Sequence, residues 1–124
     1  MSFVEPASPA TADSDGVLRV GVIGAGVMGT NHGRVLAGLP NVALVGIVDP
    51  LDEHRKRADD LIGCPVFVDL DSLLAAGVDA VTIAAPTHLH HEISLACIER
   101  GIHVLVEKPI ASTVEEGRAI VAAA

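Results

Sequence analysis

The stretch that decides the fold is "RVGVIGAGVMG", which runs from Arg19 to Gly29. It begins as a short apolar run and ends in three glycines spaced as G-x-G-x-x-G, at Gly24, Gly26 and Gly29. The apolar run predicts a strand buried on both faces, and the residues from Val27 onward predict a helix. A strand, a tight glycine loop and a helix therefore follow one another without a break.

These three glycines suit a loop that approaches a phosphate group. Gly24 permits a tight turn, Gly26 lets the backbone come close to a pyrophosphate without an intervening Cβ, and Gly29 lets the helix pack closely on the sheet. The free amides of the helix N-terminus would face the phosphates, aided by the helix dipole. The glycine pattern alone is a weak signal, but its place between a strand and a helix favours dinucleotide binding.

A second feature, Asp49, ends the next apolar run, 25 positions after Gly24. A carboxylate there accepts hydrogen bonds from ribose hydroxyls and repels a 2′-phosphate, so NAD is favoured over NADP as the cofactor. Arg55 and Arg57 follow on the next helix and weaken this preference slightly. The alternative is a structural glycine turn with a helix-capping aspartate. The strand, loop, helix and acid taken together favour the dinucleotide.

Short apolar runs and helical segments alternate along the rest of the chain. The runs span 17–24, 42–49, 64–68, 79–86 and 102–109, and the helices 27–37, 51–62, 70–76, 89–100 and a last one from 112 or 113. This alternation predicts an α/β fold, a doubly wound parallel sheet of the Rossmann type in three layers, α/β/α. We expect residues 1–16 to be a flexible extension and 17–124 to be a dinucleotide-binding domain. A complete fold of this type has a sixth strand, so the sequence indicates either part of a longer protein or a module that ends early.

Composition excludes several classes of function. Half of the 124 residues are apolar and aromatic residues are almost absent, so the core must consist of Val, Ile, Leu and Ala. A net charge of -8 argues against binding to nucleic acids or anionic membranes. No apolar run is long enough to span a bilayer, and a signal peptide is not evident, so a cytoplasmic protein is expected. Cys64 and Cys97 fit neither a disulfide framework nor a zinc motif, and Cys97 is predicted to lie in the core.

Ligands of open α/β sheets bind outside the carboxyl ends of the strands, where the strand order switches. Ala85, Pro86 and Thr87 follow the fourth predicted strand, so they should lie near the nicotinamide half of a cofactor. The nearby histidines at 88, 90 and 91 raise the question of a metal site. No cysteine or carboxylate cluster accompanies them, so no metal is predicted and they are interpreted as capping, solvent-facing residues.

The stretches "RVGVIGAGVMGTNHGRVLA", "IVDP" and "AAPTHLHHEISLACIERGIHVLVEKPIA" resemble the N-terminal domain of the glucose–fructose oxidoreductase and inositol dehydrogenase family, often called Gfo/Idh/MocA. The likeness covers nearly everything from Leu18 to the end. Its most specific part is a P-x-x-x-H after the fourth strand combined with E-K-P after the fifth. The resemblance implies an NAD(P)-dependent oxidoreductase that moves a hydride between nicotinamide and a hydroxyl-bearing carbon of a sugar or polyol.

The resemblance also implies a set of cofactor contacts beyond Asp49 and Ala85. These residues are Gly24, Gly26, Val27, Met28, Gly29, Pro86, Thr87, His90, Glu107, Lys108 and Pro109. It implies a catalytic role for Lys108, because the family's lysine lies beside the nicotinamide and contacts the reacting hydroxyl. An ammonium group there would stabilise the developing alkoxide and orient the substrate. Glu107 is expected to hold Lys108 or a neighbouring amide, and a cis Lys108–Pro109 bond is hypothesised.

Members of the family carry a C-terminal domain that supplies the substrate contacts and the partner acid or base. This sequence lacks that domain, so the chain alone is expected to bind cofactor without turnover. The expected partners are a nicotinamide dinucleotide and, in the full-length protein, a sugar or polyol, and exposed apolar surface would be compatible with a homo-oligomer. One alternative is a stand-alone NAD(H)-binding or sensing module. Another is a Rossmann enzyme with a different substrate class, such as an amino-acid or imine reductase, and Lys108 could also be an ordinary surface lysine.

Overall fold

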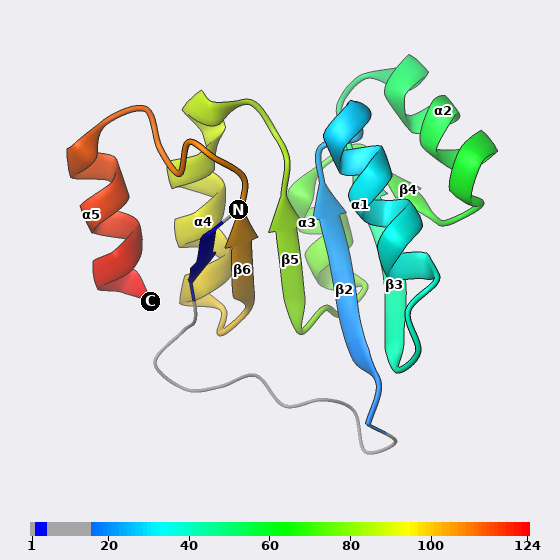
Figure 1. Ribbon diagram of the computed structural model, residues 1–124, viewed down its shortest axis with the longest axis horizontal. Helices are drawn as coiled ribbons and strands as arrows, with labels where there is room; N and C mark the ends of the chain where they lie inside the picture. Colours follow the sequence, from blue (N-terminus) through cyan, green and yellow to red (C-terminus); the bar gives the residue numbers. More distant parts are fainter. Residues whose placement is uncertain (1, 5–15) are drawn as a thin grey trace.

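A computed structural model describes residues 2–4 and 16–124. Its sheet has the strand order β1-β6-β5-β2-β3-β4, and all neighbouring strands are parallel except β1 and β6 (Figure 1). The parallel strands are β2 (Leu18–Ile23), β3 (Val42–Val48), β4 (Val66–Phe67), β5 (Ala80–Ile83) and β6 (His103–Val106). The predicted doubly wound α/β fold is confirmed, with the switch in strand order between β2 and β5.

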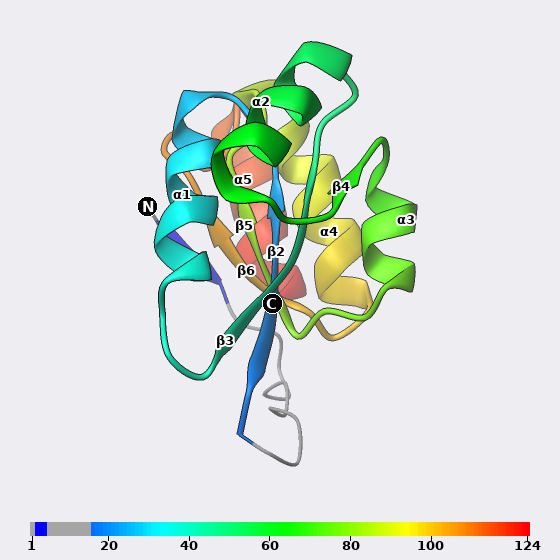
Figure 2. The same ribbon diagram turned by 90° about the vertical axis from the view of Figure 1, so that its right-hand side faces the viewer.

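Helices cover both faces of the sheet. They are α1 (Val27–Ala37), α2 (Asp52–Ile62), α3 (Leu70–Ala75), α4 (His90–Glu99) and α5 (Val114–Ala123), and a 3₁₀ turn, η1 (Thr87–Leu89), precedes α4. Figure 2 shows α1 on one side of the sheet and α3 and α4 on the other. This is the predicted three-layer arrangement, and it results from right-handed crossovers between parallel strands.

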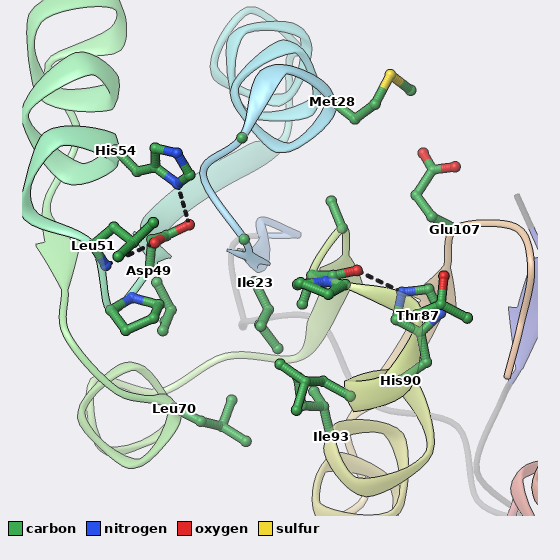
Figure 3. Close-up of a pocket in the computed structure, with 18 of the residues that line it drawn as sticks. Ile23, Met28, Asp49, Leu51, His54, Leu70, Thr87, His90, Ile93 and Glu107 are labelled. Atoms are coloured by element: carbon green, nitrogen blue, oxygen red, sulfur yellow. Dashed lines mark hydrogen bonds and ion pairs between the residues drawn. The ribbon is translucent and has the colours of Figure 1, made fainter. Parts of the chain in front are cut away.

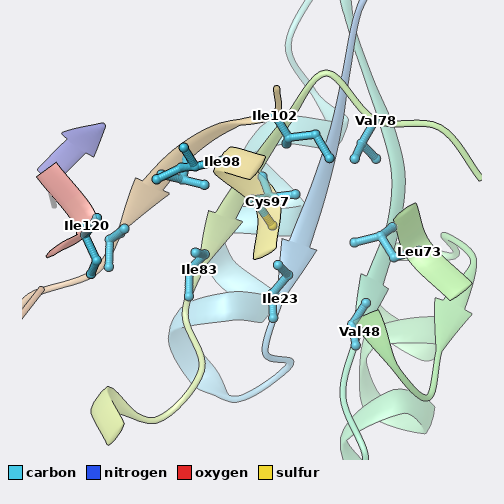
Figure 4. Packing of buried hydrophobic residues seen from close by; sticks show 12 residues of the cluster. Ile23, Val48, Leu73, Val78, Ile83, Cys97, Ile98, Ile102 and Ile120 are labelled. Atoms are coloured by element: carbon cyan, nitrogen blue, oxygen red, sulfur yellow. The ribbon is translucent and has the colours of Figure 1, made fainter. Parts of the chain in front are cut away.

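Two apolar clusters, one on each face, form the core. Val22 and Ile47 pack with Ala58 of α2, whereas their chain neighbours Ile23 and Val48 pack on the opposite face with residues of α3, α4 and α5 (Figure 4). Successive side chains of a strand point to opposite faces, so strands covered on both sides need continuous apolar runs. That requirement explains why the strands could be recognised in the sequence.

Cys97 lies fully buried in the larger of these clusters, as predicted. Burial of its thiol raises the pKa to about 12, so Cys97 behaves as a small apolar residue. Cys64 is partly buried, and both cysteines are free thiols.

The edges of the sheet differ from the sequence-based expectation. Ser2–Val4 forms strand β1, which pairs antiparallel with β6, whereas the sequence indicates a flexible extension over residues 1–16. This corrects the expectation for those three residues, and residues 1 and 5–15 of the predicted extension lie outside the described ranges. The physical reason is that β6 would otherwise present unpaired backbone groups at the sheet edge. At the opposite edge, β4 has only two residues instead of the predicted five.

Among the described helices, none has both the length and the apolar character needed to cross a membrane.

Candidate dinucleotide-binding and catalytic site

A cleft of about 660 Å³ lies at the carboxyl ends of the parallel strands, across the switch in strand order. Asp49 and His54 stand at one end of it, and Thr87, His90 and Glu107 stand at the other (Figure 3). The remaining lining residues are largely apolar. They are Ile23, Gly24, Gly26, Met28, Val48, Pro50, Leu51, Val68, Asp69, Leu70, Ala84, Ala85, Pro86, Leu89, Ile93 and Lys108.

The glycine loop between β2 and α1 forms part of the wall. Gly24 has a φ of 103°, in the left-handed region, and a Cβ there would meet the backbone of Ala84 at 2.7 Å. A Cβ on Gly29 would overlap the carbonyl oxygen of Gly24, so the helix packs against the loop only because Gly29 has no side chain. A Cβ on Gly26, in contrast, would meet no atom within 4 Å and would point into open space.

Gly26 caps helix α1, and no side chain accepts a hydrogen bond from the helix N-terminus. The first amides of the helix therefore remain available to an external acceptor. Open space at Gly26 together with these amides fits a pyrophosphate, which brings acceptor oxygens and negative charge. Met28 lines the cleft, and Val27, 70% exposed, begins the helix beside it.

Three side chains fix the peptide groups of Ala25, in the middle of the loop. Its N–H donates to Asp49 Oδ2 at 2.9 Å, and its carbonyl oxygen accepts from Thr30 Oγ1 at 3.1 Å and from Arg57 Nη2 at 2.9 Å. The loop is thus held in one conformation by contacts from both α1 and α2. The Arg57 side chain therefore helps to hold the glycine loop from α2.

Asp49 ends β3 as predicted and is 7% exposed. Its carboxylate also accepts from the Leu51 amide at 2.9 Å and from His54 Nδ1 at 3.0 Å. Burial raises the pKa of Asp49, but the hydrogen bonds from Ala25, Leu51 and His54 outweigh burial and hold it below its ordinary value. Asp49 is therefore an anion at neutral pH. Three donors leave a carboxylate with room for about one more hydrogen bond.

The residues after β5 line the opposite end of the cleft, as the sequence predicts for Ala85, Pro86 and Thr87. His90 is only 1% exposed, which corrects its interpretation as a solvent-facing residue. Its two ring nitrogens lie against main-chain carbonyl oxygens of Ala85 and Pro109.

The neighbouring histidines have other surroundings. His88 is exposed, and His91 Nδ1 lies 3.6 Å from Glu116 Oε2 of α5. The three histidines thus do not converge on a common point. Nowhere in residues 2–4 and 16–124 do three or more His, Cys, Asp or Glu side chains come together as metal ligands would.

The E-K-P segment follows β6. Glu107 Oε1 lies 2.5 Å from His32 Nε2 of α1. This corrects the expectation that the Glu107 side chain holds Lys108 or a neighbouring amide. Lys108 is exposed and lines the cleft, and no group in the described part of the chain bonds to its ammonium. The Lys108–Pro109 peptide bond is cis, as hypothesised.

Comparison with known proteins shows which family has this sequence and fold. Residues 18–124 match the family model described as the oxidoreductase family with an NAD-binding Rossmann fold, Gfo/Idh/MocA. The chain belongs to this family. It is an NAD-binding oxidoreductase domain, and the resemblance seen in its motifs is confirmed.

Two relatives and one solved structure illustrate the likeness. Inositol 2-dehydrogenase 1 of Saccharopolyspora erythraea is 43% identical over 85% of this chain and 32% of its own length. UDP-N-acetylglucosamine 3-dehydrogenase of Acidithiobacillus ferrooxidans is 36% identical over 84% of this chain and 32% of its own. The crystal structure of the WlbA dehydrogenase of Bordetella pertussis in complex with NADH and UDP-GlcNAcA matches with a TM-score of 0.80 at 32% identity, over 86% of this chain and 34% of that one. The chain thus spans about a third of the length of these Gfo/Idh/MocA proteins.

Most of the residues that the sequence predicts as cofactor contacts line this one cleft. Val27, Gly29 and Pro109 do not line it but adjoin residues that do. Sequence reasoning missed His54, Arg57 and His32, whose contacts connect α2 and α1 to the cleft. A signal for His54 existed, since it lies in the first turn of the helix that follows Asp49.

Proposed function

We propose that this chain forms the NAD(H)-binding part of an enzyme that transfers a hydride between nicotinamide and a hydroxyl-bearing carbon of a sugar or polyol. The observation that carries this proposal is the position of Lys108. It follows β6, lines the cleft and has no partner among the described residues. A lysine that served only solubility would have no reason to line the cleft that crosses the switch in strand order.

The cofactor would lie along the cleft with its adenosine end at Asp49. The glycine loop would hold the pyrophosphate through the amides of Val27 and Met28 and the open space at Gly26. The anionic Asp49 would accept from a ribose hydroxyl and repel a 2′-phosphate, which favours NAD(H) over NADP(H). Arg55 and Arg57 weaken this preference less than their charges suggest, because they bond to the Asp49 and Ala25 carbonyl oxygens.

The nicotinamide end would lie between the residues after β5 and those after β6. When bound there, the cofactor supplies the group that accepts or donates the hydride. The Lys108 ammonium would donate a hydrogen bond to the substrate hydroxyl oxygen as negative charge develops on it. Because Lys108 has no competing partner in the described residues, it is available for this role.

The substrate class is supported by two related enzymes, whose names are inositol 2-dehydrogenase and UDP-N-acetylglucosamine 3-dehydrogenase. One acts on a polyol and the other on a nucleotide sugar, so their common feature is a ring carbon that bears a hydroxyl group. The chain spans about a third of the length of each. We therefore expect the 124 residues alone to bind cofactor without turnover.

The test is a substrate screen on the longest native polypeptide that contains this chain. Inositols, aldoses, nucleotide sugars and amino acids would be offered with NAD and imines with NADH, and formation or consumption of NADH would be followed by absorbance. We expect NADH formation with at least one sugar or polyol. If NADH binds but no sugar, polyol, amino acid or imine supports hydride transfer, the chain is a cofactor-binding module without catalysis. Turnover with amino acids or imines alone would assign a different substrate class.

A further inference from the structure

His90 bridges the two segments that form the nicotinamide end of the cleft. Its Nε2 lies 2.7 Å from the Ala85 carbonyl oxygen, at the end of β5. Its Nδ1 lies 2.9 Å from the Pro109 carbonyl oxygen and 3.2 Å from that of Ile110, beyond β6. The ring is 1% exposed and belongs to the first residue of α4, so one rigid element contacts both segments at once.

The partners of the ring are main-chain carbonyl oxygens. A carbonyl oxygen only accepts hydrogen bonds, so the ring is the donor in such a contact. Carbonyl oxygens of both segments lie within 3.2 Å of the ring nitrogens, so the buried ring connects the segment after β5 to the segment after β6.

None of the charged groups on the described elements next to the ring bonds to it. On the cleft side, Glu107 pairs with His32, and Lys108 has no partner among the described residues. On the α5 side, Glu116 pairs with His91, and Glu92 lies on α4 itself. Near the ring, β5 and η1 contribute only the exposed His88. Main-chain carbonyl oxygens, rather than a carboxylate, are therefore the partners of the His90 ring.

The consequence concerns Lys108. The Pro109 carbonyl oxygen on one side lies against His90, and the Glu107 amide on the other side donates to the Ile83 carbonyl oxygen at 3.1 Å, so the backbone is held on both sides of Lys108 while its side chain is free. We propose that His90 is a positioning residue, which holds the Lys108–Ile110 backbone against Ala85 and so directs the Lys108 ammonium into the cleft. The proposal rests on the proposed function only in the role that it gives to Lys108.

The first measurement does not depend on activity. Backbone ¹⁵N relaxation would report the order of the Ile110 amide in the protein and in its variants. His90→Gln should lower the Ile110 order parameter from about 0.85 toward about 0.6, whereas the exposed His88→Gln should leave it unchanged. An Ile110 amide as rigid in His90→Gln as in wild type would overturn the proposal.

The second measurement uses turnover of the longest native polypeptide. His90→Gln should lower kcat about 100-fold, the cost of a misplaced catalytic group, while the Kd for NADH changes less than about threefold. His88→Gln should behave as wild type. An equal loss of NADH affinity and turnover would mark His90 as a general structural residue and contradict the proposal. A wild type that binds NADH without turnover would instead remove the proposed function and leave the relaxation result to decide the role of His90.

Discussion

The two ends of the cleft differ in how their charged groups are held. At one end, the Asp49 carboxylate is buried and accepts hydrogen bonds from two backbone amides and His54. At the other end, the Lys108 ammonium is exposed and has no partner in the described part of the chain. One charge is fixed in advance by the fold, whereas the other keeps its hydrogen-bonding capacity.

This difference matches the roles that we propose for the two ends. A cofactor-selecting carboxylate is most discriminating when its position does not change, and preorganised donors fix that position. A group that meets developing charge on a substrate must have unused hydrogen-bonding capacity. The Lys108 backbone is nevertheless restrained on both sides, through Glu107 and Pro109, so only the side chain is free.

The largest effect is expected at the free end. In the longest native polypeptide, Lys108→Ala should lower kcat about 10²–10³-fold, since it removes a donor to developing negative charge. The Kd for NADH, measured by fluorescence titration, should change little. Lys56→Ala is the matched control, because Lys56 is the only other lysine, is exposed and lies outside the cleft. If Lys108→Ala weakens NADH binding as much as it lowers kcat, Lys108 is a cofactor contact rather than a catalytic residue.

The glycine loop allows binding and folding to be separated. Gly26→Ala adds a methyl group in open space, so the protein should fold normally but lose about 100-fold in NADH affinity, or about 2.8 kcal/mol. Gly29→Ala places a methyl group on the Gly24 carbonyl oxygen and should destabilise the fold itself. Urea unfolding and calorimetric titration of both variants would test this. Normal NADH binding by Gly26→Ala would mean that phosphate does not approach this loop.

Asp49 should have a smaller effect, on selectivity. Asp49→Asn removes the negative charge that opposes a 2′-phosphate, so the ratio of the Kd for NADPH to that for NADH should fall about tenfold. Titration of both cofactors into wild type and variant measures the ratio. Asp60→Asn is a suitable control, because Asp60 is an exposed acid outside the cleft. An unchanged ratio of the two Kd values in Asp49→Asn would mean that Asp49 does not determine the choice of cofactor.

The smallest effect is the contribution of Asp49 to stability as pH changes. Its folded-state pKa lies below the unfolded value, so its contribution is present above the unfolded pKa, about 3.9, and is lost as pH falls through the folded pKa. Urea midpoints measured from about pH 6 to about pH 2 should fall less steeply for Asp49→Asn than for wild type. A steeper fall of the urea midpoint in Asp49→Asn would contradict the inference that hydrogen bonds hold the pKa of Asp49 below its ordinary value.

The sequence allowed the prediction of features that depend on short segments. The glycine loop, the continuous apolar strands and Asp49 at a strand end are local patterns with physical reasons, and each lies where it was expected. Val22 and Ile23 illustrate this, since covering both sheet faces demands apolar neighbours in succession.

Contacts between distant segments could not be predicted in the same way. The bond of His32 to Glu107 joins residues 75 positions apart, and the bridge from His90 to Pro109 joins a helix start to a strand end. Both depend on how α1, α4 and β6 are placed in space. Strand β1 belongs to the same class, because Ser2–Val4 has no local signal for pairing with β6.

We propose that the held carboxylate at Asp49 makes this domain selective for NAD(H). Calorimetric titration of the protein with NADH and with NADPH, under identical buffer and salt, tests this proposal most directly. We expect saturable binding of NADH with an affinity at least about tenfold higher than that of NADPH. Equal or tighter binding of NADPH, or no binding of either cofactor by the folded protein, would contradict it.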